Sequence, residues 1–174
     1  MSKDNAWCGI DPGVSGCLCL LTPVSIHFHD IVSDEKTAET VDKWRHEYNV
    51  KFIIEKQSLV RIPAKINHKT GKRVEGFVGG VKLIDSYAFI RGVLVALNCN
   101  WYEKTARQWH KIIPATLTKQ EILKVGDKKR AMKKRSREYA ISLYPAVQKA
   151  LARVKDHDRA EALLMAHYVR ETEL

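Results

Sequence analysis

The chain has 174 residues, of which 45% are hydrophobic and 29% are charged, and its formal net charge is +10 at pH 7. This length and composition predict a soluble globular protein with a single domain spanning residues 1–174. They exclude a membrane-spanning protein, because no apolar run approaches the ~20 residues that a transmembrane helix needs. The positive charge favours a polyanionic partner, either nucleic acid or an anionic membrane surface.

The four cysteines are Cys8, Cys17, Cys19 and Cys99, and none has zinc-finger spacing to another cysteine or to a histidine. Three of them lie in apolar stretches near the start, which predicts small buried side chains in a protein of a reducing compartment. The polar first seven residues do not have the pattern of a secretory signal peptide. We therefore expect a cytoplasmic protein.

Three short apolar runs near the start predict β-strands at Trp7–Ile10, Cys17–Leu21 and Ile26–Asp30, the third with a weaker pattern. The segment Asp11-Pro12-Gly13 between the first two is typical of a turn. We therefore expect the first two strands to form a hairpin.

A helix, a strand and a long loop are predicted next. Thr37–Tyr48 has apolar residues at spacings of three and four, as an amphipathic helix does. Lys51–Ile54 is a short β-branched run that predicts a buried strand ending at Glu55. Leu59–Gly80 is basic and has no clear hydrophobic period, so we expect a long loop, and loops of this length are usually functional or disordered.

The remaining sequence predicts mainly helices. The expected elements are helices at Val81–Leu97, Thr105–Ile112, Asp127–Leu143 and Asp158–Arg170, and a strand at Asn100–Glu103. The first of these helices is apolar enough to be well buried, and the third is strongly basic. Early antiparallel strands followed by alternating strands and helices predict an α/β fold, with a mixed sheet and helices packed on its faces.

Acidic residues stand at positions where a folded chain rarely places them. Asp11 and Glu55 each end a buried strand, and Asp158 and Glu161 share one face at the start of the last helix. Strand ends and a helix terminus can converge at one edge of a sheet. Carboxylates gathered there would repel one another unless cations neutralise them.

Clustered carboxylate oxygens suit Mg²⁺, with Mn²⁺ as a substitute. Two such ions at one site could activate water and stabilise the leaving oxygen of a phosphodiester. We expect Asp11 to bridge both ions, and Glu55, Asp158 and Glu161 to bind them individually. Three of the acids also have a simpler interpretation: Asp11 as a turn residue, Asp158 as an acid that favours the helix dipole, and Glu161 as a solvated helix residue. Glu55 is harder to explain in this way, because an acid at the end of an apolar strand needs a partner.

Four segments resemble the RuvC family of Holliday-junction resolvases, including its phage relatives. They are Gly9–Gly13, Ile53–Gln57, Asp127–Ala131 and Asp158–Ala166, and their order and spacing extend from residue 7 to 168. The first segment alone also resembles the start of sugar kinases and other actin-like proteins. The combination is far more specific than any one segment.

The resemblance implies an RNase H-like fold with a mixed five-stranded sheet, helices on both faces, and a homodimer. It implies an endonuclease that nicks two strands symmetrically across a four-way DNA junction, in a bacterial or phage-infected cell and with no membrane partner. Its metal ligands would be Asp11, Glu55, Asp158 and Glu161, although the family usually has Asp at the last place. Asp156 or His157 lies close enough to replace Asp158.

The same resemblance suggests Lys111 and Lys128 as active-site lysines, and the alternative for both is a solvated side chain. It also implies that the segment Leu59–Gly80 enters the junction, where Phe77 or Leu59 would separate base pairs or simply anchor the segment. The alternative for the cationic helix face is a solubilising role only. Salt-sensitive phosphate contacts are expected from Arg61, Lys65, Lys69, Lys72, Arg73, Lys129, Arg130, Lys133 and Lys134.

The apolar helix Val81–Leu97 is the candidate dimer interface, with full burial inside one subunit as the alternative. Three rival functions stay open. One is an RNase H or less selective flap nuclease on the same scaffold, and another is a non-catalytic DNA-binding module. The third, an actin-like ATPase, needs a two-lobed architecture for which 174 residues are too few.

Overall fold

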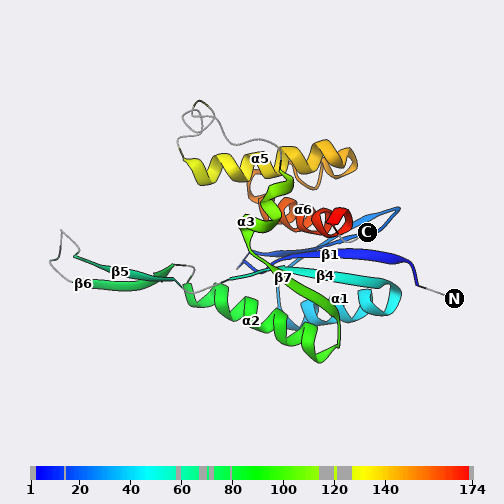
Figure 1. Cartoon of the computed structure of the whole chain (residues 1–174), viewed down its shortest axis with the longest axis horizontal. Coiled ribbons are helices and arrows are strands. Elements are labelled where there is room, and N and C mark those ends of the chain that lie inside the picture. Colours follow the sequence, from blue (N-terminus) through cyan, green and yellow to red (C-terminus); the bar gives the residue numbers. More distant parts are fainter. Residues whose placement is uncertain are drawn as a thin grey trace.

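The computed structural model describes residues 3–13, 15–57, 60–66, 70, 73–78, 80–113, 120 and 127–172. A five-stranded sheet forms its centre, in the order β3-β2-β1-β4-β7 (Figure 1). The strands are β1 (Asn5–Asp11), β2 (Cys17–Leu21), β3 (Ile26–Asp30), β4 (Asn49–Glu55) and β7 (Asn100–Lys104). β1 pairs antiparallel with β2 and parallel with β4, and β4 pairs parallel with β7, so the sheet is mixed as predicted.

Helices cover both faces of this sheet (Figure 1). On one face lie α1 (Asp34–Glu47) and α2 (Gly80–Ala96), and on the other lie α3 (Ala106–Trp109), α5 (Lys128–Leu143) and α6 (His157–Thr172). Short 3-10 helices η1 (His110–Ile112), η2 (Pro145–Val147) and η3 (Val154–Asp156) join them. The predicted α/β class, with a mixed five-stranded sheet between helices, is confirmed.

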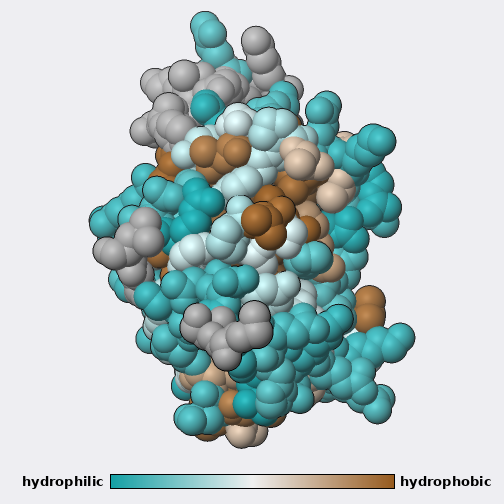
Figure 2. Space-filling model, turned by 90° about the vertical axis from the view of Figure 1, so that its right-hand side faces the viewer, coloured by the Kyte–Doolittle hydropathy of each residue, from teal (hydrophilic) through white to brown (hydrophobic). Residues whose placement is uncertain are grey.

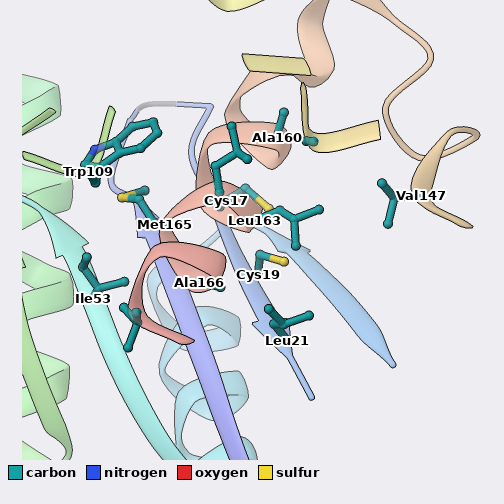
Figure 3. Packing of buried hydrophobic residues seen from close by; sticks show 14 of the residues in the cluster. Cys17, Cys19, Leu21, Ile53, Trp109, Val147, Ala160, Leu163, Met165 and Ala166 are labelled. Carbon is teal, nitrogen blue, oxygen red and sulfur yellow. The ribbon is translucent and has the colours of Figure 1, made fainter. Parts of the chain in front are cut away.

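The alternating side chains of the central strands build a separate core on each face of the sheet. Cys8, Ile10 and Phe52 face the α1 and α2 side, whereas Cys19 and Ile53 face the α6 side. Figure 3 shows the second core, in which Trp109 and Met165 lie near Ile53. Both cores are built from β-branched and other apolar residues at every second strand position, as a sheet buried on two faces requires.

Gly9 allows α6 to pack directly on the middle of β1. A Cβ built on Gly9 would lie 2.0 Å from the Ala162 carbonyl oxygen and 2.6 Å from the Ala166 nitrogen. Only a residue without a side chain therefore permits this approach of helix backbone to strand. The close contact places the first turn of α6 beside the carboxyl end of β1.

Cys8, Cys17 and Cys19 are fully buried within the strands, and Cys99 is half-buried. All four are free thiols, and burial raises the pKa of each above its ordinary value. They act as small apolar core residues, as predicted.

The segment predicted as a long basic loop contains a hairpin, so that prediction is wrong. β5 (Val60–Ile66) pairs antiparallel with β6 (Arg73–Val78), and a register shift lies between Ile62 and Lys65. The hairpin extends from the carboxyl end of β4, away from the sheet (Figure 1). Its β-branched residues favour strands. Pro63 and the bulge interrupt the alternation by which a strand is recognised in a sequence.

The prediction that α2 is well buried is wrong for one of its faces. Tyr87, Ile90 and Leu94 are buried against the sheet, but the side chains of Val81 and Val95 are 69% and 63% exposed. None of the described helices has both the length and the apolar character that crossing a membrane would require. Figure 2 shows the end of the molecule where the N-terminus lies, a mainly hydrophilic face with scattered apolar patches.

Candidate active site

Asp11 and Glu55 lie at the same edge of the sheet because they end two neighbouring parallel strands. The register pairs Ile10 of β1 with Ile54 of β4, so the next residue on each strand is one of these acids. Parallel strands bring their carboxyl ends together, and ligand sites in α/β sheets commonly lie there. Two carboxylates that are 44 positions apart in the sequence are thereby adjacent in the fold.

The N-terminal part of α6 brings Asp158 and Glu161 to this edge. α6 lies over β1 and β2, and its residues three apart share a face. The hydroxyl of Ser15, in the turn after β1, donates a 2.7 Å hydrogen bond to Asp158 Oδ2. This bond ties the start of α6 to the turn that follows Asp11.

The other three carboxylates lie near enough to Asp11 to repel its charge. Burial raises the pKa of Asp11 well above its ordinary value and is the largest cause. Repulsion by Glu161, Asp158 and Glu55, in that order, raises the pKa further. The Gly13 N–H opposes this by donating a 3.1 Å hydrogen bond to Asp11 Oδ1. Cations bound at this edge of the sheet would offset this repulsion between the carboxylates.

Two side chains hold the Glu55 carboxylate in place. The indole N–H of Trp109 donates to Oε2 at 3.0 Å, and the Gln57 amide donates to Oε1 at 3.2 Å. Burial raises the pKa of Glu55, and these two hydrogen bonds oppose that effect. Trp109 itself is fully buried, so it fixes the orientation of Glu55 from a rigid position.

The carboxylates do not form a closed coordination shell. Among the residues that the structure describes, no three His, Cys, Asp or Glu side chains are gathered tightly enough to hold an ion together. The donor set still fits a hard divalent cation, because it consists of carboxylate oxygens from three separate elements. The metal-binding role of Asp11, Glu55, Asp158 and Glu161 stays a prediction.

Asp156 is occupied elsewhere, whereas His157 faces Asp158. Asp156 accepts hydrogen bonds from the backbone and the guanidinium of Arg153. Although burial alone would raise its pKa, these contacts with Arg153 lower it below the ordinary value. His157 Nε2 lies 2.7 Å from Asp158 Oδ1 and also contacts the Lys133 ammonium. The geometry therefore favours Asp158 or His157 over Asp156 as the ligand.

A cleft of about 550 Å³ lies beside the carboxylates. Its lining includes the acids Glu55 and Glu161 and the α5 cations Lys128 and Lys133. The other lining residues are Ala106, His110, Asp127 and Met132. Of the two predicted lysines, Lys128 lines this cleft, whereas Lys111 is exposed on η1 and is not among the described lining residues.

A second hollow, of about 650 Å³, lies along α5. It is lined by Asp127, Arg130, Lys133, Lys134, Arg137, Val154 and His157, which include three of the predicted phosphate-binding residues. Lys69, Lys72 and Leu59 lie outside the described residues. The structure places the backbones of Arg61, Lys65, Arg73 and Phe77 on the hairpin and that of Lys129 on α5, but their side chains are outside the described part.

Sequence reasoning missed the supporting residues Ser15, Gln57, Trp109 and His110. Gln57 stands two residues after Glu55, which is a local signal for a hydrogen bond. Trp109 is 54 positions from Glu55 and Ser15 is 143 positions from Asp158, and no sequence pattern links these pairs.

No protein-family model and no curated protein matches the chain. Among solved structures, the fold is similar to that of T. thermophilus RuvC in complex with Holliday junction substrate, with a TM-score of 0.50 and 13% identity. The similarity covers 96% of this chain and 96% of that chain. The fold is RNase H-like. At this identity the RuvC likeness establishes the RNase H-like fold alone, as the sequence predicted, and function requires the separate argument that follows.

Proposed function

We propose that this protein is a divalent-metal-dependent endonuclease that resolves Holliday junctions by symmetric phosphodiester hydrolysis, as a phage-like member of the RuvC family. The observation that carries the proposal is that four carboxylates from β1, β4 and α6 lie near one another beside a cleft that Lys128 and Lys133 also line. The RNase H-like fold supports it, since a RuvC with that fold has been solved with a Holliday junction substrate.

The metal ligands in this proposal are Asp11, Glu55, Asp158 and Glu161, which would hold two Mg²⁺ ions, with Mn²⁺ as a substitute. Such ions supply activation of water and neutralisation of the charge that develops on the phosphate. The protein contributes rigid orientation. Trp109 and Gln57 fix Glu55, and Ser15 fixes Asp158, so little reorganisation is needed when a phosphate enters.

In this proposal, the lysine and arginine side chains of α5 bind the phosphates of the DNA backbone. Arg130, Lys133 and Lys134 line the hollow next to the cleft, and the side chains of Lys128 and Lys133 line the cleft itself. Lysine and arginine at such positions contact phosphates without reading the base sequence. Lys128, which lines the cleft together with Glu55 and Glu161, would stabilise charge on the reacting phosphate, and Lys111 on η1 is the second proposed active-site lysine.

The β5–β6 hairpin is proposed to enter the junction. It extends from the end of β4, and its first strand begins at Val60, so it starts close in the chain to Glu55 of the candidate active site (Figure 1). Phosphate contacts are assigned to Arg61, Lys65, Lys69, Lys72 and Arg73 of this segment, together with Lys129 of α5. Phe77 is proposed to separate base pairs at the branch point, which costs a few kcal/mol per unstacked step.

Symmetric cutting needs two active sites, and the exposed face of α2 is the proposed dimer interface. Val81 and Val95 are exposed on it, and no described residue of the same chain buries them. Two copies related by a two-fold axis would bury this apolar surface and present their carboxylate clefts to opposite strands.

The experiment is a cleavage assay with purified protein and Mg²⁺, comparing a synthetic four-way junction with a linear duplex, a flap and an RNA–DNA hybrid. We expect paired nicks on the junction and none with Asp11→Asn, which keeps its DNA affinity because Asp11 binds no phosphate directly. Equal cutting of all substrates would replace the proposal with an RNase H or flap nuclease. DNA binding without any metal-dependent cutting would replace it with a non-catalytic module.

A further inference from the structure

The hollow along α5, here called the α5 pocket, adjoins the carboxylate cleft. Its lining is Asp127, Arg130, Lys133, Lys134, Arg137, Val154 and His157. Asp127 and Lys133 also line the cleft, so the two spaces share a wall. His157 contacts Asp158 from the pocket side. A strand whose phosphate lies at the carboxylates would therefore have its neighbouring nucleotide at the α5 pocket.

The rim of the α5 pocket carries an excess of positive charge. No ion pair joins Arg130 or Arg137 to an acid among the described residues. Asp127 is the one acid in the lining of the pocket as described, against four lysine and arginine side chains. Lys134 has only a solvent-exposed pair with Glu138 at 3.6 Å, which contributes little. These cations stand on one face of α5, at the three- and four-residue spacing of neighbouring helix turns. The rim is therefore suited to phosphate groups.

The wall of the same pocket is apolar, which phosphate binding alone does not require. The side chain of Val154 is 82% exposed there, among the largest exposures of an apolar side chain in the described part of the chain. The aliphatic stems of the lysine and arginine side chains add to this apolar surface. A volume of about 650 Å³ lies within the range of small-molecule sites. Charge at the rim and apolar surface on the wall match a nucleotide, with its anionic phosphate and its flat base.

We propose that the α5 pocket binds one unpaired nucleotide next to the scissile phosphate. Its phosphate pairs with Arg130 and Arg137, and its base lies against Val154. The inference rests on the proposed function, and it adds a reason for branch selectivity. A nucleotide at a branch point can leave its stack at a lower cost than one inside a duplex. A pocket that requires an unpaired base therefore favours junctions over linear DNA.

The test compares two ligands that carry the same phosphates. One is an oligothymidylate of about five nucleotides, and the other has the same backbone with every base replaced by an abasic tetrahydrofuran. Binding to the full chain is measured by fluorescence anisotropy in the presence of a chelator, so no cleavage occurs. We expect the oligothymidylate to bind about tenfold more tightly, as burial of one apolar side-chain-sized surface would give.

Two valine variants separate the pocket from the rest of the surface. Val154→Asp is expected to abolish the preference for bases, and Val154→Ser is expected to reduce it. The matched control is Val24→Asp, because Val24 is 94% exposed and does not line the pocket, and it should leave the preference intact. Arg137→Ala should weaken both ligands by the same factor, since both keep their phosphates.

Equal affinity of the wild-type protein for the two ligands would overturn the inference, because the pocket would then bind phosphates but not bases. A preference that survives Val154→Asp would overturn it as well, by placing the base elsewhere. Neither result depends on cleavage, so failure of the nuclease proposal is recognised separately, by the absence of junction cutting in the metal-dependent assay.

Discussion

Replacing Gly9 by alanine tests whether α6 must touch the backbone of β1. A Cβ at this position would lie 2.0 Å from the Ala162 oxygen, 2.6 Å from the Ala166 nitrogen and 2.8 Å from the Met165 Cβ. All three are backbone atoms or a Cβ, so no rotation of a side chain relieves the contact. The strand, the helix or both must move.

The size of the movement follows from the shortest contact. Ordinary van der Waals contact begins at 3.4 Å, so the 2.0 Å approach requires a separation of more than 1 Å. Overpacking of a core costs about 1–3 kcal/mol of unfolding free energy. Because α6 carries Asp158 and Glu161, its retreat would also displace these acids from Asp11, and a misplacement of about 1 Å can cost about 100-fold in rate.

The assays for Gly9→Ala are denaturant unfolding and metal-dependent junction cleavage. We expect the free energy of unfolding to fall by about 1–3 kcal/mol. We expect the rate of junction cleavage to fall by about 100-fold. The control for the unfolding measurement alone is Gly92→Ala on α2, where an added Cβ meets nothing within 4 Å. Alanine should stabilise that helix by about 0.5–1 kcal/mol. Wild-type stability and activity in Gly9→Ala would refute the close packing of α6 on β1 and its role in the site.

Two further predictions concern protonation. Trp109→Phe keeps an aromatic ring but removes the indole N–H that lowers the pKa of Glu55. Because Glu55 acts as a carboxylate, the acidic limb of the plot of kcat/KM against pH should move to higher pH. An acidic limb that stays in place would contradict the role of this hydrogen bond. In metal-free protein the pKa of Asp11 is raised above its ordinary value of 3.8, so the folded state binds more protons than the unfolded state. The free energy of unfolding should therefore fall as the pH rises from the ordinary pKa through the raised pKa. Asp11→Asn should flatten this decline and be the more stable protein at neutral pH, as chemical unfolding across about pH 4–8 would show; an equally steep decline in Asp11→Asn would assign it to other groups.

The sheet could be predicted from the sequence because its strands carry a local signal. Trp7–Ile10 and Lys51–Ile54 are short, largely apolar runs that are each followed directly by an acid, and each lies within a strand of the structure. The convergence of Asp11 and Glu55 followed from the same runs, since both acids directly end them. The register itself, Ile10 with Ile54, needed the structure.

The hairpin and the supporting contacts could not be predicted in the same way. Pro63 and the register shift between Ile62 and Lys65 break the two-residue alternation that identifies a strand. The hydrogen bond from Trp109 to Glu55 depends on how α3 lies against β4, which is a tertiary property. The composition of α2 suggested burial on all sides, but only one face of a helix can lie against a sheet.

The central claim is that the four carboxylates bind divalent cations together, and calorimetric titration of the full chain with Mn²⁺ tests it most directly. The proposal predicts about two ions per chain for the wild-type protein, as a two-metal site requires. Asp11→Asn should lose the more tightly bound ion, since the other three acids all act electrostatically on Asp11. Absence of binding to the wild-type chain, or an unchanged titration for Asp11→Asn, would contradict the claim.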